Sequence, residues 1–297
     1  MPCYKPIKGY RTLGGGFSVS KSKSIGIEMQ VPCNGCIGCR IKRSKEWAIR
    51  CMHESTLHEQ NSFITLTYDN ENIPEDHGLC HAHFQKFMKR LRFHCRTKVR
   101  YYMAGEYGNG PDGGLGRPHY HAIIFGYDFP DKYIWNENSK LYRSETLEKL
   151  WPMGHSSIGN VSYQSAKYVA QYVMKKINGN LAETHYRKTD TETGEYYEVE
   201  PEYNAMSLKP GIAYDWYQRY SADIFPGDFV IIDGQKQPTP RYYLKMLEKN
   251  DPSMFKWIKQ KRRETAKRHQ ADNQPDRLEI REKLTQSNLN RNERKLA

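Results

Sequence analysis

VRYYMAGEYGNGPDGGLGRPHYHAIIFG, residues 99–126, holds two strand-like stretches on either side of a glycine-rich segment. Residues 99–108 and 117–126 are rich in aromatic and aliphatic side chains, which favour strands. The segment between them, NGPDGGLG, has four glycines and a proline, so we expect a turn or loop there. The sequence therefore predicts that the two strands pair as an antiparallel hairpin.

The neighbouring segments predict the other elements of the same domain. NSFITLTYD, residues 61–69, has strong β-propensity and is a candidate central strand. Apolar residues at helical spacing predict helices over residues 41–57, 81–94 and 165–176. The order helix, strand, helix, strand, strand, helix fits an α+β fold, in which helices pack on one face of a single antiparallel sheet.

Composition divides the chain into four predicted parts. A Cys-rich N-terminal segment covers residues 1–55, a core domain covers residues 56–180, an extension packed on the core covers residues 181–250, and a basic tail covers residues 251–297. Within the extension, the polar residues 180–205 are expected to form an exposed excursion.

The tail is strongly basic. From Lys256 onward it holds thirteen Lys and Arg against six Asp and Glu, which is +7 of the formal net charge of +12. This composition favours a basic helical arm, or a partly disordered tail, that binds nucleic acid. A solvated helix held by charge pairs four residues apart is the alternative.

The overall composition limits the function classes. With 297 residues, 37% of them hydrophobic, the chain can fill a real core. A net charge of +12 favours phosphate-bearing partners, so nucleic acid is the leading ligand class. No run of about 18 apolar residues occurs and the N-terminus lacks the apolar stretch of a signal peptide, so we expect a cytosolic protein that does not bind membranes.

A cysteine array predicts a structural metal site. Three of the seven cysteines form a C-x2-C-x2-C array in PCNGCIGC: Cys33, Cys36 and Cys39. This spacing lets thiolates converge on a zinc ion, and Cys3 is the preferred fourth ligand, with Cys51 or His53 as substitutes. Iron–sulfur ferredoxins share the spacing, but the Cys-Pro that usually follows is absent. Three reduced thiols that bind no metal are the remaining alternative.

Two histidines lie at the head of the second strand of the hairpin. Because side chains alternate along a strand, His119 and His121 share one face and Tyr120 points to the other. Another His-x-His pair, His81 and His83, begins a predicted helix, where a spacing of two does not share a face. Only the strand pair therefore predicts a ligand set.

A carboxylate on the other strand of the hairpin would complete that set. Glu106 lies across the turn from the histidines, so two nitrogens and one carboxylate could hold a hard divalent ion with open positions for water or substrate. The alternative is that Glu106 is a surface residue of the hairpin.

A pair of tyrosines offers a nucleophile. Tyr168 and Tyr172 are four residues apart in YVAQYVMKK, so on a helix both phenols project from one face. A phenol has a pKa near 10 and needs a cation or base to attack at neutral pH; Lys175 and Lys176 follow at suitable spacing. The alternative is that the two tyrosines are amphipathic residues at the edge of the core.

Taken together, these motifs carry a family resemblance. FITLTYD, GRPHYHAIIFG and YVAQYVMKK, in that order, resemble the three motifs of the HUH endonucleases, the rolling-circle replication initiators that nick single-stranded DNA. The doubled tyrosine, with PCNGCIGC upstream, is similar more narrowly to the replication initiators of gokushoviruses, small single-stranded DNA phages of the microvirus group. The resemblance spans residues 33–176.

The resemblance implies a fold and a metal. Members have an RRM-like antiparallel sheet and hold Mg²⁺ or Mn²⁺ on paired histidines and a third polar ligand. Carried over, the ligands would be His119, His121 and Glu106, and residues 56–180 would be the nuclease core.

The resemblance also implies a reaction and partners. A tyrosine attacks phosphorus and leaves a 5′-phosphotyrosyl enzyme and a 3′-hydroxyl that primes the host polymerase. The family motif reads Tyr-x-x-Lys, which Tyr172 and Lys175 fit, whereas Tyr168 has Gln171 in place of the lysine. Tyr172 is therefore the expected initiating nucleophile. The partners would be single-stranded origin DNA and, because no Walker-type segment is present, a host helicase, in the cytoplasm of the bacterial host.

Two other functions compete with this one. A non-catalytic, zinc-stabilised single-stranded nucleic-acid-binding protein would explain the charge, the cysteines and the tyrosines. A metal-dependent hydrolase that uses water as nucleophile would explain the histidines. Neither explains why the histidine strand and the tyrosine helix occur in the same chain.

Overall fold

The computed structural model describes residues 3–110, 115–138, 140–171, 176, 180–189 and 193–293. The chain forms two compact units. We call residues 45–241 the sheet unit, and residues 1–44 together with 242–297 the cysteine unit.

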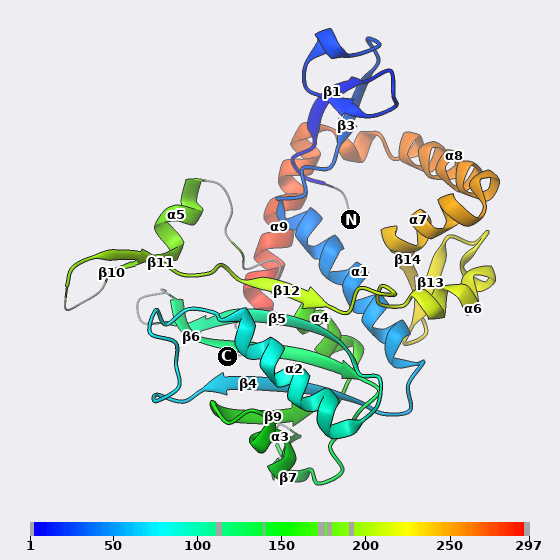
Figure 1. Ribbon diagram of the computed structural model, residues 1–297. Coiled ribbons are helices and arrows are strands. Elements are labelled where there is room, and N and C mark those ends of the chain that lie inside the picture. The colour runs from blue at the N-terminus through cyan, green and yellow to red at the C-terminus, as the bar shows by residue number, and fades with distance from the viewer. Residues whose placement is uncertain are drawn as a thin grey trace. The chain divides into compact units, whose positions relative to one another are not determined.

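An antiparallel sheet of seven strands forms the centre of the sheet unit (Figure 1). Its strands are β4 (Asn61–Tyr68), β5 (Arg100–Asn109), β6 (Leu115–Phe125), β7 (Tyr133–Asn136), β8 (Leu141–Arg143), β9 (Gly154–Gly159) and β12 (Tyr203–Met206). They lie in the order β12-β5-β6-β4-β9-β8-β7. The predicted hairpin is confirmed, because β5 and β6 pair antiparallel with Glu106 opposite His119.

The remaining elements of the sheet unit are six helices and two short strand pairs among the described residues. The helices are α1 (Ile37–Ser55), which contains the boundary between the units, α2 (His81–Cys95), α3 (Glu145–Leu150), α4 (Tyr163–Gln171), α5 (Asn180–Tyr186) and α6 (Tyr214–Ile224). The strand pairs are β10 (Arg187–Thr189) with β11 (Tyr196–Glu198), and β13 (Phe229–Ile232) with β14 (Gln235–Pro238).

Alternating burial along β4 defines the two faces of the sheet. Ile64, Leu66 and Tyr68 are at most 1% exposed, whereas the residues between them are half-buried. Because successive side chains of a strand point to opposite faces, one face is completely covered and the other is partly open. The candidate catalytic side chains project from the partly open face.

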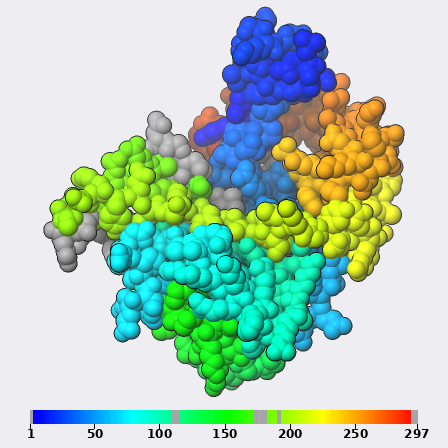
Figure 2. Space-filling model, in the orientation of Figure 1, coloured from blue at the N-terminus to red at the C-terminus, as the bar shows by residue number. Residues whose placement is uncertain are grey.

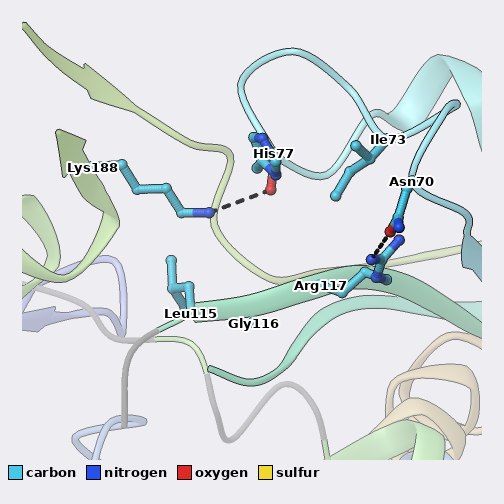
Figure 3. A pocket seen from close by; sticks show the side chains of 7 residues that line it. All are labelled: Asn70, Ile73, His77, Leu115, Gly116, Arg117 and Lys188. Carbon is cyan, nitrogen blue, oxygen red and sulfur yellow. Dashed lines mark hydrogen bonds between the residues drawn. The ribbon is translucent and has the colours of Figure 1, made fainter. Parts of the chain in front are cut away.

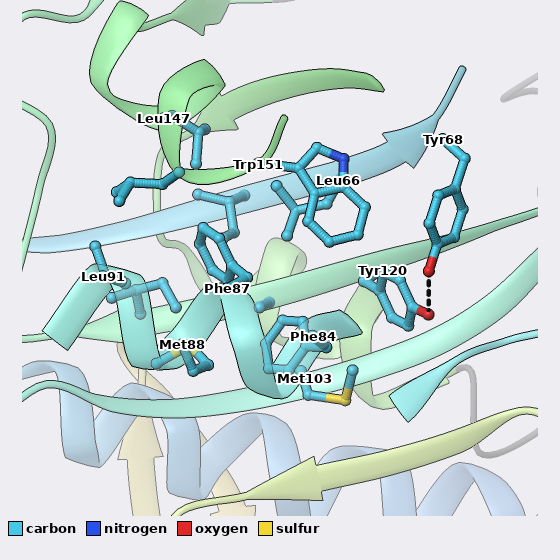
Figure 4. Packing of buried hydrophobic residues seen from close by; sticks show 14 of the residues in the cluster. Leu66, Tyr68, Phe84, Phe87, Met88, Leu91, Met103, Tyr120, Leu147 and Trp151 are labelled. Atoms are coloured by element: carbon cyan, nitrogen blue, oxygen red, sulfur yellow. Dashed lines mark hydrogen bonds between the residues drawn. The ribbon is translucent and has the colours of Figure 1, made fainter. Parts of the chain in front are cut away.

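The covered face carries the main hydrophobic core, against α2 and α3 (Figure 4). Phe84 and Phe87 of α2 and Trp151, which follows α3, are fully buried there. Tyr120 points into this core, as predicted, and its hydroxyl lies 2.9 Å from that of Tyr68. Replacing a buried ring of this kind, such as Phe87, by Ala costs about 3–5 kcal/mol, so this packing fixes the sheet behind the site.

Helices also contact the partly open face. Trp47 of α1 stacks on Tyr102 of β5, with ring centroids 4.9 Å apart, and α4 contacts β5 and β6. The predicted antiparallel sheet with helices is confirmed, and the helices are shared between its two faces. These helices cover the part of the second face that carries Tyr102, Ala104 and Ile123, which are fully buried.

A buried ion pair fastens α1 to the sheet. Glu54 of α1 accepts hydrogen bonds from Arg100 Nε of β5 and from the backbone N–H of Ala213, both at 2.5 Å. Burial alone would raise the pKa of the Glu54 carboxyl, but its hydrogen bonds with His58, Ala213 and Arg100 outweigh burial and lower the pKa. Glu54 is therefore ionised in the folded protein at neutral pH.

The predicted helices agree with the structure except at their ends. Helix α1 begins four residues before the predicted range of 41–57 and ends two before its end, and α2 matches 81–94 with one residue added. Helix α4 begins at Tyr163, and residues 172–175 of the predicted helix lie outside the described residues.

The expectation that residues 180–205 form an exposed excursion is wrong in part. Strand β12 pairs with β5 and so extends the central sheet. Tyr186, Val199 and Glu202 are each at most 4% exposed, and the Tyr186 hydroxyl donates to the Glu202 carboxylate. The polar composition of this segment gave no sign of its burial, because its few apolar residues are among those that the fold buries.

The cysteine unit joins the two ends of the chain. Its sheet has the order β2-β1-β3, from β1 (Ile7–Arg11), β2 (Phe17–Ser18) and β3 (Glu28–Val31), and its later helices are α7 (Arg241–Asn250), α8 (Pro252–Arg268) and α9 (Pro275–Glu293). Tyr4, Cys36 and Leu278 form a small buried cluster, and the Tyr4 hydroxyl lies 2.8 Å from Thr285 Oγ1. Helix α9 is thereby held against the N-terminal segment. No helix in the described part of the chain is long and apolar enough to cross a membrane.

Candidate active site

Glu106, His119 and His121 converge on the partly open face of the sheet. Glu106 Oε1 lies 2.8 Å from His119 Nε2 and 2.9 Å from His121 Nε2. The three ligand atoms all lie within 4.8 Å of one another. The hairpin register explains this convergence, because Glu106 is directly opposite His119, and His121 is two residues further along the same face. The structure thus brings together all three predicted ligands.

The other nitrogen of each imidazole is also held. His119 Nδ1 lies 3.1 Å from the carbonyl oxygen of Arg117, which can only accept, so Nδ1 carries the proton and donates it. His121 Nδ1 lies 2.9 Å from the hydroxyl of Thr65 on β4. These contacts leave both Nε2 atoms directed at the shared point, which is how outer partners orient metal-binding histidines.

Glu106 is a buried carboxylate in the folded protein. Its side chain is 2% exposed, and burial alone would raise its pKa. The hydrogen bonds and charges of the two imidazoles outweigh burial and hold the pKa of Glu106 well below its usual range. The site therefore offers one anionic oxygen and two imidazole nitrogens, a donor set that suits a divalent cation.

Tyr168 of α4 lies beside the histidines. Its ring centroid is 5.1 Å from that of His121 in an edge-to-face arrangement, and 6.4 Å from that of Phe63. Tyr168 is 45% exposed, whereas Ala166, Val169 and Ala170 on the same helix are buried. Buried residues thus anchor α4, while one predicted nucleophile stays accessible at the site.

The other predicted catalytic residues are not placed there. Tyr172, the expected initiating nucleophile, and Lys175 lie outside the described residues. Lys176 is described as a half-buried residue outside any helix or strand. The roles of these three residues stay predictions.

Sequence reasoning missed two residues that shape the site. Phe63 stacks on His121 with ring planes 5° apart and centroids at 5.8 Å, and Thr65 contacts the same imidazole. Both belong to FITLTYD, which the sequence predicts as a strand and as one of the three family motifs, with no site role for either residue. The alternation of that strand against the histidine strand was the signal that could have found them.

A lane of polar side chains extends from the site across the same face. Thr65 and Thr67 of β4 pair with Ser157 and His155 of β9, so all four lie in two adjacent rows. Thr65, Thr67 and Ser157 are half-buried and His155 is exposed. Within the described residues, this part of the sheet presents hydroxyl and imidazole groups to solvent.

A small basic pocket lies at the start of the histidine strand (Figure 3). It has a volume of about 330 Å³ and lies beside Arg117, two residues before His119. Arg117 donates to the carbonyl oxygen of Tyr68 at 2.9 Å and to the Asn70 side chain, and Lys188 enters from the opposite wall. Burial lowers the pKa of Lys188, which Asp76 partly offsets. Two cations thus line the pocket.

Four cysteines form a second convergent group, in the cysteine unit. The Sγ atoms of Cys3, Cys33, Cys36 and Cys39 all lie within 4.8 Å of one another. Cys3 Sγ is 3.6 Å from Cys33 Sγ and 3.8 Å from Cys36 Sγ. Zn–S bonds of about 2.3 Å in a tetrahedron place sulfurs about 3.8 Å apart, so these separations fit a zinc ion. The structure brings Cys3 to the array, as predicted.

Backbone groups support thiolates in this cluster. The N–H groups of Tyr4 and Cys36 donate to Cys36 Sγ at 3.3 Å and to Cys33 Sγ at 3.2 Å, respectively. Burial opposes ionisation of Cys36, but backbone hydrogen bonds lower its pKa to about 7. Cys51 and His53, the substitute fourth ligands, belong to the sheet unit and not to the cluster. Cys51 is fully buried, and the His53 ring stacks on that of Trp216 with centroids 3.5 Å apart.

Known proteins similar to this chain share one description. The family model "Replication-associated protein ORF2/G2P" matches residues 61–177. The chain is 33% identical to "Replication-associated protein VP4" of Bdellovibrio phage phiMH2K, over 87% of this chain and 80% of that protein. It is 27% identical to "Replication-associated protein ORF2" of Spiroplasma virus 4, over 83% of this chain and 77% of that protein. No solved structure gives a significant match. The chain belongs to the family of phage replication-associated proteins.

Proposed function

We propose that this protein is a replication initiator that nicks single-stranded origin DNA by metal-assisted tyrosine transesterification. The observation that supports the proposal most is the convergence of Glu106, His119 and His121 beside Tyr168 on one sheet face. A metal-ligand set next to an accessible phenol fits phosphoryl transfer to tyrosine, and neither a structural metal site nor a binding surface needs that combination.

The residues present fit Mg²⁺ or Mn²⁺. One carboxylate oxygen and two imidazole nitrogens converge, and their own hydrogen bonds hold them in place. Three protein ligands leave coordination positions open, unlike the closed four-ligand sets of structural sites. When bound, the cation would polarise the scissile phosphate and stabilise charge on the leaving oxygen.

The nucleophile is a tyrosine of the YVAQYVMKK segment. The phenol oxygen bonds to phosphorus and loses its proton to solvent, while the P–O3′ bond breaks and the 3′-oxygen takes up a proton. A 5′-phosphotyrosyl link and a free 3′-hydroxyl result. Tyr172 initiates, because Lys175 follows it in the Tyr-x-x-Lys motif and Lys176 adds a second cation that favours the phenolate. Tyr168, which the fold holds at His121, makes the second cut.

Single-stranded DNA approaches over the partly open face. The polar lane of Thr67, Ser157 and His155 lies beside the metal ligands and offers hydrogen bonds to phosphates and base edges. The pocket between Arg117 and Lys188 supplies positive charge at the end of the histidine strand. The 3′-hydroxyl is extended by a host polymerase, with a host helicase for unwinding, in the cytoplasm of the bacterial host.

The cysteine cluster holds a structural zinc ion. Its sulfur separations fit a tetrahedral site, and its four thiols leave no open position for substrate. A zinc ion here would fasten the N-terminal segment to the start of α1, and therefore stabilise the cysteine unit without taking part in the nicking chemistry.

The test is covalent capture of labelled single-stranded origin DNA in the presence of Mn²⁺. We expect an adduct that resists denaturation, is lost in Tyr172→Phe, and is reduced in Tyr168→Phe for substrates that need two cuts. Tyr163→Phe is the matched control, because Tyr163 is another phenol on α4 and is half-buried away from the described ligand contacts.

Each outcome separates the competing functions. A protein that binds the DNA but never forms the adduct would be the non-catalytic binding protein. Cleavage without an adduct, with an unlinked 5′-phosphate as product, would identify water as the nucleophile. Undiminished adduct formation by Tyr172→Phe, with loss in Tyr168→Phe, would reverse the assignment of the initiating tyrosine.

A further inference from the structure

Positive charge is concentrated in one of the two units. The cysteine unit has 23 Lys and Arg against 9 Asp and Glu, a formal charge of +14. The sheet unit has 23 against 25, a formal charge of −2. The net charge of +12 therefore does not belong to the unit that carries the candidate nicking site, and long-range attraction to DNA has to come from the cysteine unit.

Within the cysteine unit, α8 is the most basic helix of the described chain. Over Pro252–Arg268 it has seven Lys and Arg against Glu264 alone, a formal charge of +6. Helix α9, Pro275–Glu293, has four of each sign and a formal charge of zero. The two explanations of the basic tail thus apply to different helices: the charges of α9 balance, whereas α8 keeps a net positive charge.

The charges of α8 face solvent. Residues 259–268 are all exposed, and Ile258 is the last buried residue of the helix. In the described parts of the chain, Lys259, Arg263, Lys267 and Arg268 form no ion pair, whereas α9 pairs Lys283 with Glu279 at 2.7 Å. A ten-residue helical segment of about 15 Å that is exposed on all sides and carries six Lys and Arg against one Glu has no role in a core.

We propose that the cysteine unit is a separate duplex-DNA-binding module, and that the exposed half of α8 contacts the phosphates of that duplex. An α-helix fits the major groove of B-DNA, and Lys and Arg along it neutralise phosphates on both sides. Residues 259–268, KQKRRETAKR, contain no aromatic residue, and Trp257, just before them, has the Lys261 ammonium 3.7 Å from its ring centroid. The segment therefore lacks the row of free aromatic faces on which single-strand binding relies. The orange α8 segment of Figure 2 belongs to this unit.

This inference adds a task to the proposed function but can be tested apart from it. The module would hold double-stranded origin DNA, while the sheet unit acts on a single strand. The buried cluster of Tyr4, Cys36 and Leu278 and the Tyr4–Thr285 contact hold the N-terminal segment and α9 together, so the module is built from both ends of the chain.

The experiment measures duplex binding by fluorescence anisotropy as a function of salt concentration, with the full chain and without divalent cation. Arg263→Gln/Lys267→Gln in α8 is compared with Arg277→Gln/Lys283→Gln in α9. Both variants lose the same formal charge, and Gln keeps helix propensity close to that of Lys and Arg. Circular dichroism verifies that both remain folded.

We expect the α8 variant to reduce the slope of log K against log salt by about two, since each phosphate contact contributes about 0.9. Its affinity for duplex should fall more than tenfold at about 0.1 M salt. The α9 variant should keep most of the slope, because Arg277 and Lys283 are already paired with Asp272 and Glu279.

Equal slopes for the two variants would overturn the proposal, because net charge and not α8 would then account for binding. An α8 variant that loses as much affinity for a single strand of the same length as for the duplex would also overturn it, because α8 would then not distinguish a duplex. The nicking proposal is judged independently by the covalent adduct, which forms on single-stranded DNA whether or not α8 binds a duplex.

Discussion

Thr65→Val tests whether the imidazole network serves a metal ion. The Thr65 hydroxyl lies 2.9 Å from His121 Nδ1, while the opposite nitrogen, Nε2, lies 2.9 Å from Glu106. Valine has nearly the same shape and favours strands, so the substitution removes the hydrogen bond without opening the fold. His121 is only 6% exposed, so water has little access to replace the lost partner.

The expected magnitude follows from the role of that hydrogen bond. Removing an outer partner of a metal-binding histidine weakens metal affinity by about 10–100-fold, which is about 1.4–2.8 kcal/mol. We therefore expect the dissociation constant for Mn²⁺, measured by calorimetry, to rise by that factor. The Mn²⁺ concentration needed for half-maximal adduct formation should rise in parallel.

Thr67→Val is the matched control. Thr67 lies on the same strand and face, pairs with His119 in the sheet, and is also half-buried. Thr67→Val makes the same chemical change two residues further along the strand. It should leave the affinity for Mn²⁺ within about threefold of the wild-type value, below the loss expected when an outer partner of a metal-binding histidine is removed. If the two variants bind Mn²⁺ equally well, the Thr65 contact does not orient a metal ligand and the reasoning fails.

Two further predictions concern stability. Glu54→Gln should lower the free energy of unfolding by about 3–5 kcal/mol, because Arg100 would be left buried opposite a neutral partner. The pKa of Glu54 in the folded protein is below its value in the unfolded chain, so its contribution to stability is complete above about pH 4.3 and is lost as pH falls through the folded pKa. The free energies of unfolding of wild type and variant, measured by chemical denaturation, should therefore converge in acid. A constant difference between them down to acid pH would contradict the ion pair. Cys3→Ser should reduce the amount of zinc found by metal analysis and lower the melting temperature. Cys95→Ser, which changes a cysteine outside the cluster, should retain the zinc. Equal amounts of zinc in both variants would contradict the four-sulfur site.

The sequence was sufficient to bring Glu106, His119 and His121 together because its signals there are local. The alternation of β6 placed His119 and His121 on one face, and a short hairpin placed Glu106 opposite them, so neither step needed long-range information. The contribution of β4 could not be predicted in the same way. Thr65 reaches His121 only because β4 inserts between β6 and β9, and strand order is set by packing between distant segments.

The division of charge between the two units could not be predicted from the sequence either, because it also depends on contacts between distant segments. The sequence shows a basic tail, but not that the tail and the N-terminal cysteines belong to one unit, because that requires contacts across more than 200 residues, such as the one from Tyr4 to Thr285. Once the units are known, their formal charges are +14 for the cysteine unit and −2 for the sheet unit. The proposed attraction to duplex DNA and the proposed nicking chemistry then belong to different units. A site of one carboxylate and two imidazoles keeps its metal more readily when the unit that carries it is not strongly cationic, since nearby like charge disfavours a bound cation. The residues of the sheet unit therefore add no net positive charge against the cation site on which the proposed chemistry depends, while those of the cysteine unit supply the attraction to a polyanion.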